Sequence, residues 1–341
     1  MTAIRIGVVG AGALGFHHVR LLRTQPGATL VGFHDASAER AAQVTKELGV
    51  AAFASVPALL DKVDAAVVVV PTKAHHDVAM DALQRGIHLL IEKPIAATIE
   101  QADAIVSLAA DKRALVQVGH VERFNRAVRA AMPYLDAPRF VESERLAPFN
   151  PRGTDVAVVL DLMIHDIDLV HALVRDRVSD VRAVGVGVLT NVDMTNAWLQ
   201  FQSGAVANIK ASRVARDKLR KLRIFQRNGY FSLDLGGGTG EFYRLRGDID
   251  IAELAKSAQS IEKFVERIKL KAPDGEPLRL EHESFLAAIR GEAPTVVTGE
   301  DGRDALAVAL RIVDAVHASL PALQSRPGVA ADASQSVARR A

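Results

Sequence analysis

The chain has 341 residues, of which 49% are hydrophobic and 24% are charged, and this composition excludes a protein that is disordered throughout. Its 42 basic and 40 acidic residues leave a formal net charge of +2, too small to indicate binding to nucleic acid or to anionic membranes. The absence of cysteine excludes disulfides, iron–sulfur clusters and thiolate zinc sites. The N-terminal residues show no signal-peptide pattern and no apolar run is long enough to cross a bilayer, so we expect a cytoplasmic protein without nucleic-acid or membrane partners.

Residues 1–120 alternate between short apolar runs and longer helical patterns, which is typical of parallel strands joined by crossover helices. The expected strands are 4–9, 30–33, 65–70, 88–91 and 115–118, and the expected helices are 13–24, 38–48, 75–85 and 98–110. The run AAVVVV at 65–70 indicates a central strand that is buried on both faces. We therefore predict a doubly wound parallel α/β sheet over 1–120.

The pattern changes after residue 120, where one expected helix, at 156–174, precedes several strands. These strands, separated by short turns such as Asn228-Gly229, are 180–189, 194–202, 205–212, 219–226 and 230–235. We predict an α+β domain over 121–320, with a mostly antiparallel or mixed open sheet and helices on one face. A second copy of the chain would cover the other face, so we expect a homo-oligomer, a dimer or a tetramer. A late helix at 305–320 could pack back on the first domain, and 321–341 is expected to be a loose tail.

A glycine-rich run follows the first expected strand directly and opens the first helix: Gly10-Ala11-Gly12-Ala13-Leu14-Gly15. In this setting Gly10 permits a tight turn, Gly12 lets the backbone approach a pyrophosphate, and Gly15 permits close packing of helix and strand. A turn made for packing alone is the alternative. The strand and helix that flank the run favour a Rossmann-type dinucleotide site.

Asp35 lies twenty positions beyond the last of these glycines, at the end of the second expected strand. A carboxylate at this place accepts hydrogen bonds from both adenine-ribose hydroxyls and repels a 2′-phosphate, which favours NAD over NADP. Asp35 could also cap the helix that follows, although Ser37 could do so instead. Arg40 leaves some room for NADP.

Glu92-Lys93-Pro94 stands at the carboxyl end of the strand 88–91, the edge of a parallel sheet where ligands bind. Partial desolvation there would lower the pKa of Lys93 and let it share a substrate proton or donate a hydrogen bond. A surface ion pair between Glu92 and Lys93 is the simpler alternative.

Asp161, His165 and Asp168 are spaced i, i+4 and i+7, so they share one face of the expected helix at 156–174. Apolar residues fill much of the remaining helix surface, and the polar stripe must therefore meet partners or a ligand. Asp161 could orient the His165 ring and raise its basicity, which suits a general base. A core histidine with satisfied partners and a metal site are the alternatives, and we expect no metal because a fourth ligand is missing.

Five segments in order resemble the Gfo/Idh/MocA oxidoreductases. They are VVGAGALG at 8–15, VVPTKAHHDVA at 69–79, IEKPIA at 91–96, VGHVERFN at 118–125 and the D-x-x-x-H pair at 161–165. The resemblance covers residue 1 to about residue 320, and within the family it is strongest with dehydrogenases of UDP-N-acetylglucosamine. The glycine-rich stretch that relatives carry before the D-x-x-x-H helix is replaced here by DVAVVL.

This resemblance implies that the glycine-rich loop and Asp35 hold NAD(P). It places Pro71 and His75 near the nicotinamide ribose and leaves open whether His75 or His76 faces the cofactor.

The same resemblance implies that Glu92 and Lys93 contribute to the cofactor site, with Lys93 also contacting the reacting hydroxyl and a cis proline often following it. Asp161 and His165 match the catalytic pair, with His165 as the proton acceptor.

The implied reaction is the NAD-dependent oxidation of a secondary hydroxyl on a sugar ring, most of all the 3-hydroxyl of UDP-N-acetylglucosamine. Arg123 and Asn125 fall where relatives line the cofactor and sugar pocket. Arg123, Arg145 and Arg152 are candidates for binding the diphosphate, because a guanidinium fork suits phosphate oxygens, and a solvated surface position is the alternative for each. Other sugar or inositol dehydrogenases, an enzyme that retains its cofactor and reduces it again in the same cycle, and a non-catalytic NAD(P) sensor are the alternatives.

Overall fold

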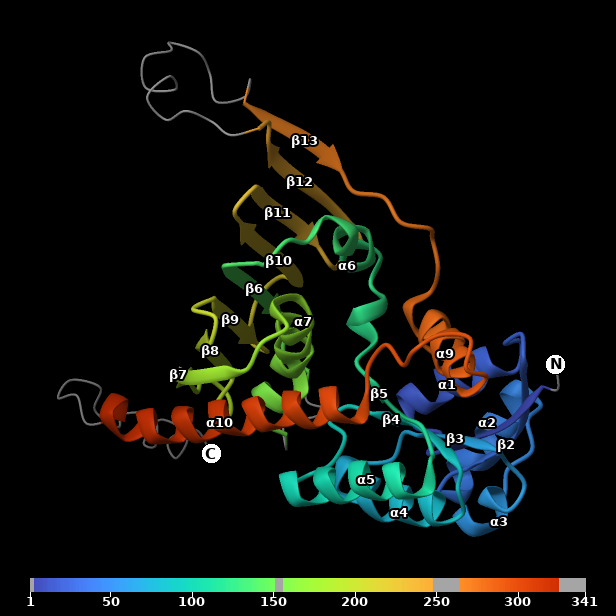
Figure 1. The fold of residues 1–341 in the computed structure, drawn as a ribbon. Helices are drawn as coiled ribbons and strands as arrows, with labels where there is room; N and C mark the ends of the chain where they lie inside the picture. Colours follow the sequence, from blue (N-terminus) through green and yellow to red (C-terminus); the bar gives the residue numbers. More distant parts are fainter. Residues whose placement is uncertain (1–2, 151–155, 248–263, 325–341) are drawn as a thin grey trace, which may run out of the picture.

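The computed structural model describes residues 3–150, 156–247 and 264–324, with side chains described up to residue 320. The described chain forms a five-stranded sheet and an eight-stranded sheet, which lie one after the other along the sequence (Figure 1). None of the helices in these three ranges combines the length and apolarity needed to cross a bilayer.

The first sheet is parallel, with the strand order β2-β1-β3-β4-β5, as predicted. Its strands are β1 (Ile4–Val9), β2 (Ala28–His34), β3 (Ala65–Val68), β4 (His88–Glu92) and β5 (Val116–Gly119). The connecting helices are α1 (Ala13–Leu22), α2 (Ala38–Leu48), α3 (Val56–Leu60), η1 (Thr72–Ala74), α4 (His75–Gln84) and α5 (Ile99–Lys112). One face packs against α3, α4 and α5 and the other against α1 and α2, so the sheet is doubly wound. The short α3 was not predicted, because five residues are too few to show helical periodicity.

The second sheet is mixed and has the strand order β13-β12-β11-β10-β6-β9-β8-β7. Its strands are β6 (Phe140–Leu146), β7 (Val178–Val186), β8 (Met194–Phe201), β9 (Val206–Ser212), β10 (Leu219–Gln226), β11 (Gly229–Asp234), β12 (Thr239–Leu245) and β13 (Val265–Lys269). Within the described part of this second sheet, only the β6–β9 pair is parallel. The sequence did not predict β6, β12 or β13. In β6 the buried positions are Val141, Ser143 and Arg145, so two of three are polar and hide the strand pattern.

Helices cover one face of this second sheet (Figure 1). The remaining helical segments are η2 (Val121–Phe124), α6 (Arg126–Ala131), η3 (Met132–Tyr134), η4 (Val159–Met163), α7 (Ile164–Val174), α9 (Pro277–Ile289) and α10 (Gly299–Gln324). The expected single helix at 156–174 is thus divided into η4, a π-helical turn, and the α-helix α7. The helix expected at 305–320 is longer at both ends, which corrects the prediction that the chain is loose from residue 321 onward. Residues 325–341 lie outside the described part.

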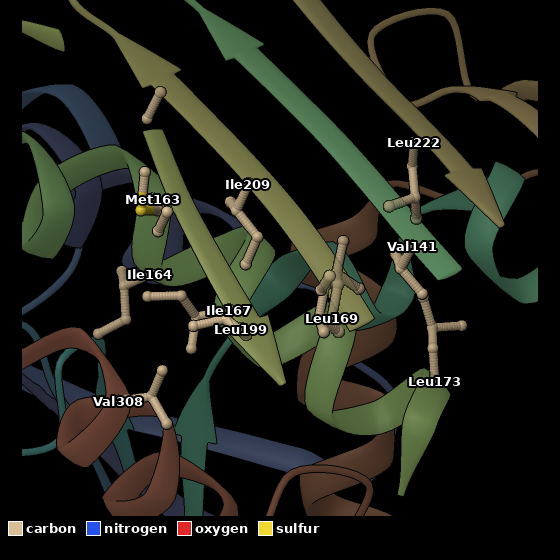
Figure 2. Close-up of a cluster of buried hydrophobic side chains, with 14 of the residues drawn as sticks. Val141, Met163, Ile164, Ile167, Leu169, Leu173, Leu199, Ile209, Leu222 and Val308 are labelled. Carbon is tan, nitrogen blue, oxygen red and sulfur yellow. The ribbon is translucent and has the colours of Figure 1, made fainter. Parts of the chain in front are cut away.

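The hydrophobic core of the second half lies between α7 and the sheet (Figure 2). Ile167 and Leu169 of α7 pack in the same cluster as Leu199 and Ile209 of the sheet, and Val308 of α10 joins it. The helix α10 also contacts α5 and β5, so it connects the two sheets. Because α7 is enclosed by the sheet and by α10, the polar residues on it are held in fixed positions.

Candidate active site

The glycine-rich loop joins β1 to α1 and leaves space in front of the helix. Gly10 has a φ of +94°, and a Cβ there would lie 2.6 Å from the carbonyl oxygen of Val69. A Cβ on Gly12 would meet no described atom within 4 Å, and no described side chain caps α1, which starts at Ala13-Leu14. A Cβ on Gly15 would overlap the Gly10 carbonyl. The uncapped N–H groups at the start of α1 fit a pyrophosphate, so the loop has the geometry of a dinucleotide site.

Asp35 lies against this loop at the end of β2. Its carboxylate accepts the backbone N–H of Ala11 at 2.7 Å and that of Ser37 at 2.9 Å. The cap of α2 is Ser37, whose hydroxyl oxygen accepts the backbone N–H of Arg40 at 3.2 Å. The Arg40 guanidinium donates to the carbonyl oxygens of Ala11 at 2.7 Å and Gly12 at 3.2 Å. Both charged groups are therefore fixed beside the loop, and Asp35 does not cap the helix.

His75 begins α4, four residues after Pro71, which precedes η1. The side chain is 1% exposed, and its ring nitrogens lie 2.9 Å from the Pro94 carbonyl oxygen and 2.8 Å from that of Val70. Burial lowers the pKa of His75. The neighbouring His76 is partly exposed and belongs to a different environment. Both ring nitrogens face backbone carbonyls and so join two loops of the site, and the place of His75 near the nicotinamide ribose stays a prediction.

Lys93 follows β4 and extends to η4. Its amine donates to the carbonyl oxygen of Asp161 at 2.6 Å, and the Asp161 carboxylate lies 3.8 Å away. Burial lowers the pKa of Lys93, while the nearby carboxylates of Asp161 and Glu92 oppose that shift. The Glu92 carboxylate instead accepts the backbone N–H of Lys93 at 3.2 Å. Lys93 is thus a desolvated amine at the junction of the two halves, and the alternative of a surface pair with Glu92 is wrong.

His165 is the second residue of α7, one turn beyond Asp161. Burial holds the pKa of His165 well below its ordinary value, and the positive charge of Lys93 adds to the effect. The ring is therefore neutral near pH 7 and can accept a proton. Its Nδ1 is buried without a hydrogen-bond partner in the described chain. The Asp161 carboxylate lies 3.8 Å from the Lys93 amine, and the orienting of the His165 ring by Asp161 stays a prediction.

Asp168 is fully buried and bound by Arg123. The guanidinium of Arg123 donates to the two carboxylate oxygens at 2.7 and 2.8 Å. Asp168 and Asp161 therefore have different partners, and the three residues of the predicted stripe do not converge on one metal position. Arg123 also lines a cavity of about 700 Å³ together with Arg129 and Arg175.

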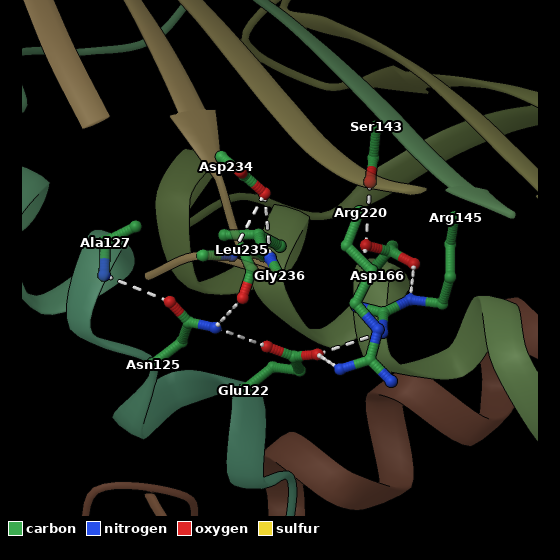
Figure 3. A network of polar contacts seen from close by, with 11 residues as sticks. Glu122, Asn125, Ala127, Ser143, Arg145, Asp166, Arg220, Asp234, Leu235 and Gly236 are labelled. Carbon is green, nitrogen blue, oxygen red and sulfur yellow. Dashed lines mark hydrogen bonds and ion pairs between the residues drawn. The ribbon is translucent and has the colours of Figure 1, made fainter. Parts of the chain in front are cut away.

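A buried ion network holds α7 against β6 and η2 (Figure 3). Arg145 is 3% exposed and donates to Asp166 at 2.5 Å and to Glu122 at 2.9 Å. Ser143 donates to the same Asp166 carboxylate at 2.7 Å. These carboxylates raise the pKa of Arg145 against the opposing effect of burial. The prediction that Arg145 binds a diphosphate is corrected, because its guanidinium is enclosed and already neutralised.

Asn125 has an internal role as well (Figure 3). Its side-chain oxygen accepts the backbone N–H of Ala127 at 3.0 Å and so caps α6, while its nitrogen donates to Leu235 at 2.8 Å and Glu122 at 2.9 Å. Both of its N–H donors and its oxygen bind groups inside the protein, which gives Asn125 a structural role in place of the predicted one in the substrate pocket. Arg152 lies outside the described residues.

His120 is a residue of this region that the sequence analysis did not single out. It follows β5 directly, is fully buried, and neither ring nitrogen has a partner within the described ranges. Burial lowers the pKa of His120, and charges on Asp168, Arg123 and Lys93 also act on it. The available signal was its place at the carboxyl end of the last parallel strand, where ligands collect.

Comparisons with known proteins agree with this geometry. Residues 4–120 match a family model described as an oxidoreductase family with an NAD-binding Rossmann fold, and residues 117–232 match the GFO/IDH/MocA C-terminal domain. The chain is 40% identical to UDP-N-acetylglucosamine 3-dehydrogenase from Acidithiobacillus ferrooxidans over 94% of this chain and 99% of that protein. The fold matches a solved structure of that enzyme with a TM-score of 0.84. The match covers 94% of this chain and 100% of the chain in that structure. The scyllo-inositol 2-dehydrogenase (NAD(+)) of Bacillus subtilis is 30% identical, over 62% of this chain and 68% of that protein.

The substitution Arg145→Ala should lower the free energy of unfolding by about 3 to 5 kcal/mol, because it leaves two carboxylates buried without their counter-charge. Urea denaturation measures this loss. The matched control is Arg223→Ala on β10, which removes a half-exposed pair with Glu142 and should cost less than about 1 kcal/mol. Equal stability of Arg145→Ala and the wild type, with loss of nucleotide-sugar binding alone, would restore the diphosphate role.

Proposed function

Because the chain belongs to the Gfo/Idh/MocA oxidoreductase family, we propose that it is an NAD-dependent dehydrogenase of a secondary sugar hydroxyl, namely the 3-hydroxyl of UDP-N-acetylglucosamine. The observation that carries the proposal is the approach of Lys93, from the dinucleotide half, to the helical segment that bears His165. The likeness to the Acidithiobacillus ferrooxidans enzyme over nearly the whole chain supports the choice of substrate.

NAD, when bound, supplies the acceptor for the hydrogen on the carbinol carbon. The neutral His165 takes the hydroxyl proton, for which its lowered pKa keeps it unprotonated near pH 7. The Lys93 ammonium donates a hydrogen bond to the same oxygen and stabilises the negative charge that develops there. Asp161 holds the lysine through its carbonyl oxygen.

The choice of NAD over NADP rests on Asp35. Its carboxylate is fixed at the glycine-rich loop by two backbone N–H groups, where a 2′-phosphate would meet a like charge. Arg40, whose guanidinium could otherwise pair with a 2′-phosphate, donates to the carbonyl oxygens of Ala11 and Gly12 in the loop. The loop thus favours a ribose with a free 2′-hydroxyl.

A direct assay tests the proposed function. The protein is mixed with NAD or NADP and a panel of UDP-sugars, free sugars and inositols, and the reduced nicotinamide is followed by absorbance. We expect turnover with NAD and UDP-N-acetylglucosamine, and at least a ~100-fold loss in Lys93→Ala and His165→Ala with NAD binding near normal, because each removes a group that handles the proton or its charge.

Four results of this assay would contradict parts of the proposal. Oxidation of inositols or free sugars alone would replace the nucleotide-sugar substrate, and a preference for NADP would overturn the role of Asp35. Binding of NAD without any turnover would favour a sensor. Wild-type turnover in either variant would remove that residue from the mechanism.

The uncovered face of the second sheet supports a homo-oligomer. Phe140, Phe225, Tyr230 and Tyr243 form a row across four neighbouring strands, with ring-centroid distances of 5.8, 5.3 and 4.8 Å. Their chain neighbours point into the core beneath α7, so this aromatic row lies on the opposite face, which no described helix covers. A second copy of the chain would bury it.

Light scattering at micromolar concentration should therefore give a mass above the 36.6 kDa of one chain. Phe225→Glu should shift the mass toward the monomer, because it places a charge in the aromatic row. A monomeric mass for the wild type would contradict this assembly.

A further inference from the structure

Three buried side chains connect α9 to the turn that carries Lys93. His282 Nε2 lies 2.9 Å from His18 Nδ1, and His18 Nε2 lies 3.1 Å from one carboxylate oxygen of Glu92. The other carboxylate oxygen accepts the backbone N–H of Lys93 at 3.2 Å. The exposed fractions of His282, His18 and Glu92 are 1%, 0% and 6%. The chain of contacts thus runs from α9 through α1 to the end of β4 without meeting solvent.

The hydrogen bonds in this chain have a defined direction. A carboxylate only accepts, so His18 donates its Nε2–H to Glu92. When His18 carries only that proton, its Nδ1 accepts the Nε2–H of His282. Burial holds the pKa of His282 well below its ordinary value, so this ring carries a single proton near pH 7. In this arrangement both rings are in the Nε2–H form.

The backbone of β5 fixes the same carboxylate from another side. Gly119 pairs with Glu92 across the β4–β5 ladder. A Cβ on Gly119 would lie 2.9 Å from the carboxyl carbon of Glu92 and 3.0 Å from each of its oxygens. The φ of Gly119 is not in the left-handed region, so the residue is required here for the space and not for the backbone conformation.

The groups that face Glu92 come from four elements. They are His18 of α1, His75 of α4, His120 beside η2 and Glu281 of α9, while His282 of α9 lies behind His18. Burial and the negative charge of Glu92 raise the pKa of Glu281 well above its ordinary value, which favours its uncharged form. His18 is the side chain among them that donates to Glu92.

We propose that His282 and His18 are positioning residues for Lys93: they hold the Glu92 carboxylate in the place from which it fixes the lysine-bearing turn. Glu92 then sets the turn through the Lys93 backbone N–H and acts on the Lys93 amine through its charge. His18 belongs to α1, whose first turn follows the dinucleotide loop. The hydrogen bonds from His18 to Glu92 and from Lys93 to Glu92 therefore also couple that loop to the placement of the lysine. This inference rests on the proposed function, in which Lys93 acts on the substrate.

The variants that test the inference are His282→Leu, which removes the donor, and Gly119→Ala, which displaces the carboxylate without changing a polar side chain. Both should lower kcat about 10-fold and leave KM for NAD within about twofold, because a misplaced lysine weakens the reaction more than cofactor binding. His282→Gln retains an N–H donor and should recover most of kcat. The control is Ser284→Ala on the same helix. The Ser284 hydroxyl donates to Gln117 and contacts none of His282, His18 and Glu92 in the described hydrogen bonds.

The pH profile separates positioning from a general loss of stability. Lys93 donates as the ammonium, so activity is lost as the pH rises through the pKa of Lys93. Burial already lowers that pKa, while Glu92 and Asp161 oppose the lowering, with Arg145, His165 and His120 as the other groups near the amine. Displacing the Glu92 carboxylate removes part of the charge that raises the pKa of Lys93, so that pKa should fall further. The alkaline limb should therefore move to lower pH in His282→Leu and Gly119→Ala and stay in place in Ser284→Ala.

Two measurements do not depend on turnover, so they separate this inference from the proposed function. In protein with ¹³C-labelled lysine, NMR titration should show a lower pKa for Lys93 in His282→Leu and Gly119→Ala than in the wild type. In ¹⁵N-histidine spectra of the wild type, both His18 and His282 should be Nε2-protonated. An inactive wild type with these NMR results would remove the proposed function and keep the positioning role. An unchanged Lys93 pKa in both variants, or an Nδ1-protonated His18, would overturn the inference.

Discussion

The contact between the Lys93 amine and η4 constrains the whole site. Lys93 leaves the end of β4 in the parallel sheet, and the carbonyl oxygen that it binds at 2.6 Å belongs to Asp161, beside the second sheet. A largely buried ammonium needs such an acceptor, because desolvation disfavours its charge. This hydrogen bond places Lys93 beside η4, while α10, which contacts α5, β5 and α7, holds the two halves together.

The position of α7 is fixed by buried charges on two sides. Asp166 faces β6 and is bound by Arg145, while Asp168 faces η2 and is bound by Arg123. Each pair is enclosed, so removal of either arginine would leave a buried carboxylate without compensation. These pairs and the apolar contacts to the sheet hold His165 in place, although its Nδ1 has no hydrogen-bond partner among the described residues. The histidine is thus held by the packing of its helix.

The sequence was sufficient to predict those features in which each residue type suits the local structure that it forms. The apolar strands, the glycine-rich turn and Asp35 all have the residues that their local environment requires, and the first sheet was therefore predictable. It was not sufficient for β6, because the inward positions of that strand carry Ser143 and Arg145 to meet Asp166. Nor does the spacing from Asp161 to His165 reveal a π-helical turn, which depends on hydrogen bonding that residue types do not specify.

The central claim is that Lys93 and His165 act on the same carbinol. A crystal structure of the protein with NAD and UDP-N-acetylglucosamine tests it most directly. The account predicts the 3-oxygen of the sugar within about 2.6 to 3.2 Å of both the Lys93 amine and a ring nitrogen of His165. A sugar bound elsewhere, for example in the cavity lined by Arg129 and Arg175 with both residues distant from its 3-oxygen, would contradict it.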